Sequence, residues 1–150
     1  MAESTERRLV PYPRRRVFAL VADVARYPEF VPTVKACRVI SQHGSHMDVD
    51  MCVGFRLLSR WIRCSADLVP SERIDVVSSD WPFERFTLLW EFADAPGGAT
   101  VAQLTGKFTL TSTAISGLVD RFAPALVPSM VAAFVRRADA ALGDPAGLYP

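Results

Sequence analysis

The amino-acid sequence predicts an α+β fold in which a curved antiparallel sheet of about six or seven strands surrounds one long C-terminal helix. Residues 112–142 carry apolar side chains at helical spacing, and from Phe122 to Val135 the only polar side chain is Ser129. A helix this apolar must be covered on most of its circumference. The residues between 34 and 110 alternate with a period of two, and short turns separate the runs, which indicates consecutive antiparallel strands that cover the helix.

The N-terminal segment is predicted to hold one strand and two short helices. The strand spans residues 6–12, and Pro13 suits the first turn of a helix over 14–26. Residues 27–32 (YPEFVP) predict a second short helix or a turn, because each of their prolines restrains the residue before it.

Six further strands are predicted, and their alternation assigns each side chain to one face of the sheet. They span residues 34–41, 47–55, 58–69, 72–79, 85–92 and 100–112. One face of the sheet then carries Ile62, Cys64, Leu88, Trp90, Leu104 and Phe108. We expect it to lie against the helical stripe of Leu118, Phe122, Leu126 and Met130.

Two prolines, Pro124 and Pro128, lie inside the long helix, where each removes a backbone donor. They either fit the helix to a curved sheet or mark a join between two helices. Alternatively, they allow residues 114–123 to move as a lid over a cavity. The sequence leaves these alternatives open.

Composition predicts a single domain over residues 1–150, with a core over about 6–142. The net charge of +1 argues against whole-surface attraction to nucleic acid. No apolar run approaches the ~20 residues of a membrane span, and the first residues do not form a secretory signal. Cys37, Cys52 and Cys64 follow no metal or disulfide spacing, which favours reduced thiols in a cytosol.

No motif indicates catalysis. The sequence has no P-loop, no GxGxxG, no nucleophile elbow and no HExxH. His43 and His46 lie on a glycine-containing turn without further ligands at metal-binding spacing, so a solvated turn is expected. Asp23 is expected at a helix edge or cap. We therefore predict no catalytic and no metal-binding residues, and a protein that is not an enzyme.

The apolar residues themselves are the candidate site. A sheet that curls around one helix leaves a space that is filled either by large side chains or by a hydrophobic ligand. Gly54 and Gly106 favour an open interior. The candidate ligand-binding residues are Phe30, Val31, Phe55, Ile62, Cys64, Phe83, Phe86, Leu88, Trp90, Leu104, Phe108, Leu118, Phe122, Leu126 and Met130.

Four segments resemble a known family. They are ERRLVPY, VFALVADVARYPEFVP, DWPFERFTLLWEF and MVAAFVRRADAAL, which together span about Glu6 to Leu142. They look like the START-like polyketide cyclase/dehydrase family, and within it the branch of the coenzyme-Q-binding proteins and the bacterial ribosome-association toxin. The resemblance implies a helix-grip (START/Bet v 1-like) fold with a deep hydrophobic cavity.

The resemblance also implies functions. The first is non-catalytic binding of ubiquinone or a similar isoprenoid lipid, as a carrier for respiratory electron transport that needs no cofactor. The first alternative is a toxin-like module that binds the large ribosomal subunit, and the second is a polyketide cyclase or aromatase. No DNA partner is expected, and the expected location is the cytoplasm, with peripheral contact to the inner face of the cell membrane for a lipid carrier.

Three consecutive arginines separate these hypotheses. Arg14, Arg15 and Arg16 open the first helix, where the helix dipole disfavours cations. They form either an ordinary solvated face or a surface for anionic lipid headgroups or ribosomal phosphates. For a lipid carrier, the cavity mouth is expected nearby, close to Phe30, Val31 and Pro124.

Overall fold

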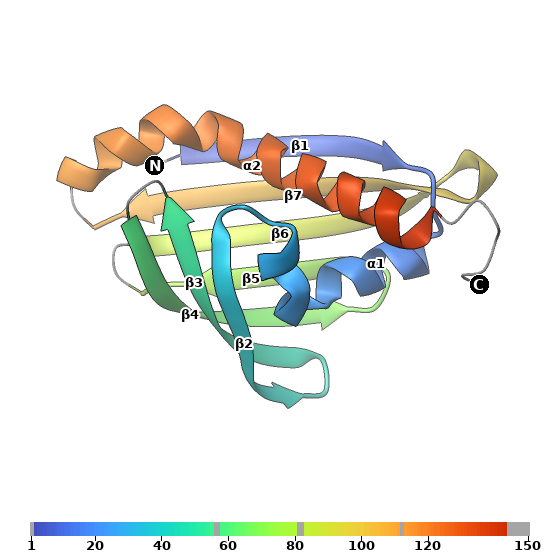
Figure 1. The fold of residues 1–150 in the computed structure, drawn as a ribbon, viewed down its shortest axis with the longest axis horizontal. Helices are drawn as coiled ribbons and strands as arrows, with labels where there is room; N and C mark the ends of the chain where they lie inside the picture. Colours follow the sequence, from blue (N-terminus) through green and yellow to red (C-terminus); the bar gives the residue numbers. More distant parts are fainter. Residues whose placement is uncertain (1, 56–57, 81–82, 112, 144–150) are drawn as a thin grey trace.

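The computed structural model describes the backbone of residues 2–55, 58–80, 83–111 and 113–143 (Figure 1). The side chains of Ala2, Phe55, Leu58 and residues 113–124 lie outside this description. The described ranges contain one seven-stranded sheet with the order β1-β7-β6-β5-β4-β3-β2, and all neighbouring strands are antiparallel. The strands are β1 (Ala2–Val10), β2 (Val34–His43), β3 (His46–Phe55), β4 (Leu58–Val69), β5 (Arg73–Ser78), β6 (Phe83–Ala95) and β7 (Ala99–Leu110). The predicted fold class is confirmed.

The N-terminal elements differ from the prediction in their bounds. The first strand begins at Ala2, because it pairs with β7 along its whole length. The predicted helix over 14–26 is two elements, α1 (Arg14–Ala22) and the 3-10 helix η1 (Val24–Glu29). The backbone of Asp23 leaves the helical region at φ −83° and ψ 69°, which ends α1. Asp23 is exposed, and it forms an ion pair of 3.2 Å with Arg26.

The long C-terminal helix α2 (Thr113–Leu142) is continuous through both prolines. The predicted alternative of a join between two helices is therefore wrong. A proline removes one backbone hydrogen bond, and a helix can bend at that point while its remaining bonds and its packing hold it together. Figure 1 shows α2 as a single bowed rod that crosses β1 and β7.

Three of the described helical elements, α1, η1 and α2, cover one face of the sheet, which we call the inner face. α2 packs on β1 and β7, α1 contacts α2, β6 and β7, and η1 packs on β2. A tight turn, η2 (Pro96–Gly98), joins β6 to β7, with Gly97 and Gly98 at positive φ. The inner face therefore holds the core, and the opposite face, which we call the outer face, has no helical cover among the described elements.

Close contacts, rather than an open interior, explain why Gly54 and Gly106 lack side chains. A Cβ atom on Gly106 would lie 2.8 Å from Cγ2 of Val127, so this glycine lets α2 approach the sheet closely. A Cβ atom on Gly54 would lie 2.5 Å from Cε of Lys35, whose chain crosses the strand there. The inference from these glycines to an open interior is wrong, because protein side chains occupy both spaces.

Candidate functional site

The inner face carries most of the residues that were predicted to bind a ligand. Nine of them are buried: Val31, Ile62, Cys64, Phe86, Leu88, Trp90, Leu104, Phe108 and Met130. Phe30, Phe83 and Leu126 are half-buried and pack against this core. The side chains of Phe55, Leu118 and Phe122 lie outside the described residues. The alternation in the sequence therefore predicted correctly which face of these strands is buried. The ligand-binding role of these residues stays a prediction.

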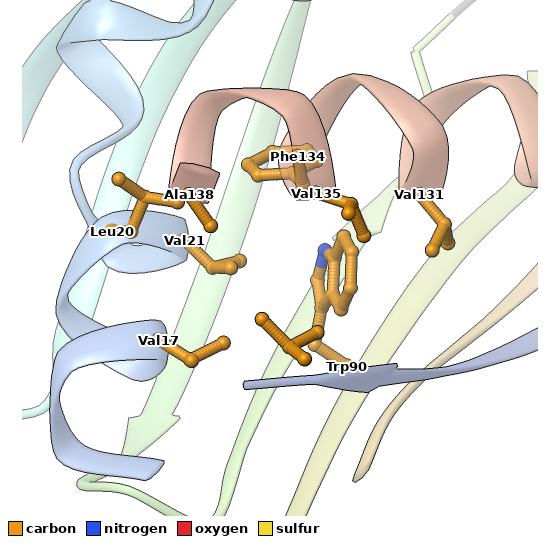
Figure 2. A pocket seen from close by; sticks show the side chains of 9 residues that line it. Val17, Leu20, Val21, Trp90, Val131, Phe134, Val135 and Ala138 are labelled. Atoms are coloured by element: carbon orange, nitrogen blue, oxygen red, sulfur yellow. The ribbon is translucent and has the colours of Figure 1, made fainter. Parts of the chain in front are cut away.

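The space beneath the C-terminal half of α2 is filled by side chains. Trp90 projects from β6 toward Val131, Val135 and Phe134, with α1 alongside (Figure 2). Its ring centroid lies 5.0 Å from that of Phe134 in an edge-on contact and 5.9 Å from that of Phe92 in a stacked one. The cavity that remains measures about 10 Å³, about the least that holds one water. Trp90 is therefore a packed core residue in this region.

The short helix η1 packs against the C-terminal half of α2. The ring of Phe30 lies 5.0 Å from Phe134 and 5.9 Å from Tyr27. The guanidinium of Arg137 lies 5.0 Å from the Phe30 ring, and its Nη2 donates to Oε1 of Glu29 at 2.9 Å. The buried Tyr27 hydroxyl donates to the carbonyl of Val21, and burial raises the pKa of Tyr27.

These contacts correct the expectation that Phe30 and Val31 border a cavity mouth near Pro124. Val31 is fully buried, and Phe30 packs on Phe134, which follows Pro124 by almost three helical turns.

Three phenylalanines form a second aromatic group at the other end of the inner face. Phe83 and Phe86 from β6 and Phe108 from β7 have ring centroids 5.1, 5.2 and 6.5 Å apart. β6 begins and β7 ends here, so the group lies near the start of α2. We call these residues the phenylalanine cluster.

The outer face contains a groove that no sequence pattern assigned to a binding site. The groove has a volume of about 230 Å³, and Trp61 lies in it half-exposed. The Arg38 guanidinium lies 5.2 Å from the Trp61 ring. The guanidinium of Arg63 donates two hydrogen bonds to Asp50, one from Nε and one of 3.2 Å from Nη2. The backbone N–H of Arg63 donates to Asp80 at 2.6 Å. The hydrogen bond from Arg63 lowers the pKa of Asp50.

A signal for this groove was present in the sequence, since the alternation assigns Trp61 and Arg63 to the outer face. Arg38 lies on β2, and only the β2–β3 and β3–β4 registers bring it to Trp61. Asp80 lies in the loop after β5, where the backbone N–H of Arg63 holds it.

His46 is more than a solvated turn residue. Its Nδ1 lies 2.8 Å from Asp67 and its Nε2 lies 3.2 Å from Asp48, and the hydroxyls of Ser65 and Ser41 also donate to Asp48. Hydrogen bonding, to Asp67 first and then to Asp48, raises the pKa of His46. Asp67 was missed because it lies opposite His46 only through the β3–β4 register. No group of three metal-binding side chains was found in the part of the chain that the structure describes.

The arginines at the start of α1 do not share one environment. Arg14 Nε forms an ion pair of 3.3 Å with Asp94 at the end of β6. Arg15 is exposed, and Arg16 is half-buried. Their role as a membrane or partner surface stays a prediction. No helix within the described ranges is both long and apolar enough to cross a membrane.

The fold and its covered inner face define an α+β domain in which a sheet holds a long C-terminal helix. The chain belongs to the polyketide cyclase/dehydrase and lipid transport family, whose model matches residues 10–135. It is 31% identical to the ribosome association toxin RatA of Vibrio cholerae serotype O1, over 96% of this chain and 100% of that relative. It is 27% identical to the mitochondrial coenzyme Q-binding protein COQ10 of Drosophila melanogaster, over 94% of this chain and 60% of that relative.

A solved START superfamily protein from Mycobacterium smegmatis has the same fold. The TM-score is 0.80 at 14% identity, and the match covers 92% of this chain and 97% of that chain. At this identity the likeness shows the fold alone. The predicted family is confirmed.

Proposed function

We propose that this protein binds the ribosome and hinders the association of its subunits without catalysing a reaction. The observation that carries the proposal is the 31% identity to the ribosome association toxin RatA, which extends over 96% of this chain and all of that relative. The filled interior beneath the C-terminal half of α2 also supports action through the surface, since a surface interaction needs no ligand-sized cavity there.

A bound domain of this size can act by steric exclusion. If it occupies the surface through which one ribosomal subunit meets the other, the second subunit cannot dock while it is bound. The described backbone is one covered sheet with few long loops, so it can serve as a rigid obstacle without a change of shape.

The test is to mix the purified protein with separated bacterial ribosomal subunits and to resolve the mixture on a sucrose gradient. We expect fewer associated ribosomes and more free subunits, with the protein in one of the subunit fractions. An unrelated protein of similar size and charge is the control. An unchanged subunit profile at saturating protein would contradict the proposal.

Binding of an isoprenoid lipid such as ubiquinone is the second candidate function. The phenylalanine cluster favours it, because it places aromatic surface at the end of the inner face near the start of α2. The relative named coenzyme Q-binding protein supports the same candidate. Burial of each CH₂ group of a polyprenyl tail contributes about 0.8 kcal/mol, so a few isoprene units give useful affinity.

This candidate predicts that Leu88→Glu and Met130→Glu reduce the lipid that copurifies with the protein. Both side chains are buried on the inner face, and a carboxylate without a partner is costly in an apolar space. Thr87→Glu is the matched control, since Thr87 precedes Leu88 on β6 and faces outward. Organic extraction and mass spectrometry measure the lipid, and circular dichroism checks the fold. Folded variants with undiminished lipid would exclude the candidate.

A further inference from the structure

The outer-face groove is built around the half-exposed ring of Trp61. Trp61 is 50% exposed, although tryptophan is highly buried on average. Cys52 lies opposite it on β3, and Ala36 lies opposite Cys52 on β2. Both neighbours are too small to cover an indole. The Arg38 guanidinium lies over the ring, 5.2 Å from its centroid, so a flat partner stacks on Trp61 when this exposed side chain moves aside.

Polar groups frame this ring, and they differ in how firmly they are held. Arg63 is tied to Asp50 through two guanidinium nitrogens, so its side chain is fixed. Arg38 has a side chain that is 68% exposed, and it reaches Asp50 only at 3.8 Å. Arg38 can therefore turn from Asp50 toward an incoming anion with little loss. Asp80 lines the other side of the groove and presents a carboxylate.

Lys35 adds a cation beside the groove. Its side chain lies over Gly54, which is two residues beyond Cys52 on β3, on the outer face of the sheet. Trp61, Cys52 and Ala36 form a row across β4, β3 and β2. Lys35 lies on one side of this row, and Arg38 and Arg63 lie on the other. The charged side chains that line the groove balance, with Arg38 and Arg63 against Asp50 and Asp80, and Lys35 beside the groove adds one positive charge. This excess favours an anionic partner over a cationic peptide.

The volume limits the partner further. At about 230 Å³, the groove is smaller than the roughly 300–1,000 Å³ of pockets for drug-sized ligands. It matches one planar ring system with its substituents. Stacking on tryptophan, an arginine for a phosphate and a carboxylate that accepts from an exocyclic amino group are together the chemistry that recognises an unpaired nucleotide of RNA.

We propose that the groove formed by Arg38, Asp50, Trp61, Arg63 and Asp80 binds a single unpaired nucleotide of RNA. The base stacks on Trp61, a neighbouring phosphate pairs with Arg38, and the next phosphate along the strand lies toward Lys35. The inference rests on the proposed function in one respect, since it takes ribosomal RNA as the source of the nucleotide.

The test measures binding of labelled single-stranded RNA oligonucleotides by fluorescence anisotropy. Trp61→Ala should weaken binding roughly 5- to 150-fold, the range for loss of one stacked base, and Trp61→Phe should restore most of it. Val77→Ala is the matched control, because Val77 is an exposed apolar residue of the same face on β5. Circular dichroism verifies that each variant is folded.

The phosphate contact has a separate readout. Arg38→Gln should reduce the slope of log affinity against log salt by about 0.7, the value for one phosphate of a single strand. Arg73→Gln, an exposed arginine of the neighbouring strand β5, should leave the slope unchanged. Equal slopes for both variants would contradict the assignment of Arg38.

The outcomes separate this inference from the proposed function. Equal RNA affinity of Trp61→Ala and Val77→Ala, or no RNA binding by the wild type, overturns the inference. If the wild type binds no RNA and Trp61→Ala still loses the effect on ribosomal subunits, the groove holds a protein partner and the proposed function stands. If RNA binding depends on Trp61 while the subunits associate normally, the groove is supported and the proposed function fails.

Discussion

At the scale of single residues, Gly106 shows how closely α2 approaches the sheet. Gly106→Ala would place a Cβ atom 2.8 Å from Val127 and 3.1 Å from Phe108. Val127 is fully buried and cannot move aside. Overpacking of this kind costs about 1–3 kcal/mol, and we expect a loss of that size in the free energy of unfolding, measured with urea.

Gly54→Ala is the matched control for this substitution. Its new Cβ atom would lie 2.5 Å from Cε and 2.9 Å from Cγ of Lys35, and this exposed side chain can adopt another rotamer. The control should therefore cost much less than Gly106→Ala. Equal losses would show that close helix–sheet contact is not what excludes a side chain at Gly106.

His46 should make stability depend on pH. Its hydrogen bonds to Asp67 and Asp48 raise its pKa above 6.5. The protonated ring therefore stabilises the fold fully below that pH, and this stabilisation is lost as the pH rises through the raised pKa. We expect His46→Gln to reduce the decline in unfolding free energy between mildly acidic and mildly alkaline buffer, measured with urea. A wild-type decline that persists in the variant would assign the effect to another group.

At the scale of elements, the contacts between η1 and α2 combine aromatic packing with an ion pair. Phe30→Ala removes contacts with Tyr27 and Phe134, and we expect it to cost about 1–3 kcal/mol of stability. Arg137→Gln removes a partly exposed ion pair with Glu29, for which about 0–1 kcal/mol is expected. Thermal and urea unfolding measure both. The reverse order would mean that the ion pair, not the aromatic packing, holds η1.

At the scale of the whole molecule, the arginines of α1 distinguish a ribosomal surface from a lipid surface. Replacement of Arg14, Arg15 and Arg16 by glutamine should weaken the effect on subunit association if these residues contact ribosomal phosphates. Binding to anionic liposomes should then be unchanged. The lipid-carrier candidate requires the reverse, since each arginine near an anionic membrane contributes about 1 kcal/mol.

The replacement of Arg14 has a structural effect that needs its own control. Arg14 pairs with Asp94, so Asp94→Asn tests whether loss of this ion pair alone changes either assay. If the triple variant behaves like the wild type in both assays, the three arginines are an ordinary solvated surface.

Local patterns in the chain were enough to predict the architecture. The alternation of β6 requires Leu88 and Trp90 to share one face, and the apolar stripe from Leu126 to Phe134 requires a covered helix. Both inferences depend on periodicity along one segment, which backbone geometry sets. They needed no knowledge of distant residues, and the fold class, the order of the elements and the buried face followed from them.

Contacts between segments that are distant in the chain were beyond the reach of these patterns. Asp67 meets His46, and Arg38 meets Trp61, only because the β2–β3 and β3–β4 registers place them opposite or diagonal to one another. The packing of Trp90 against Phe134 depends on how closely α2 approaches the sheet, which Gly106 permits. Whether an apolar face encloses a ligand or fills itself is a question of volume, and volume is set by the packing of several segments at once.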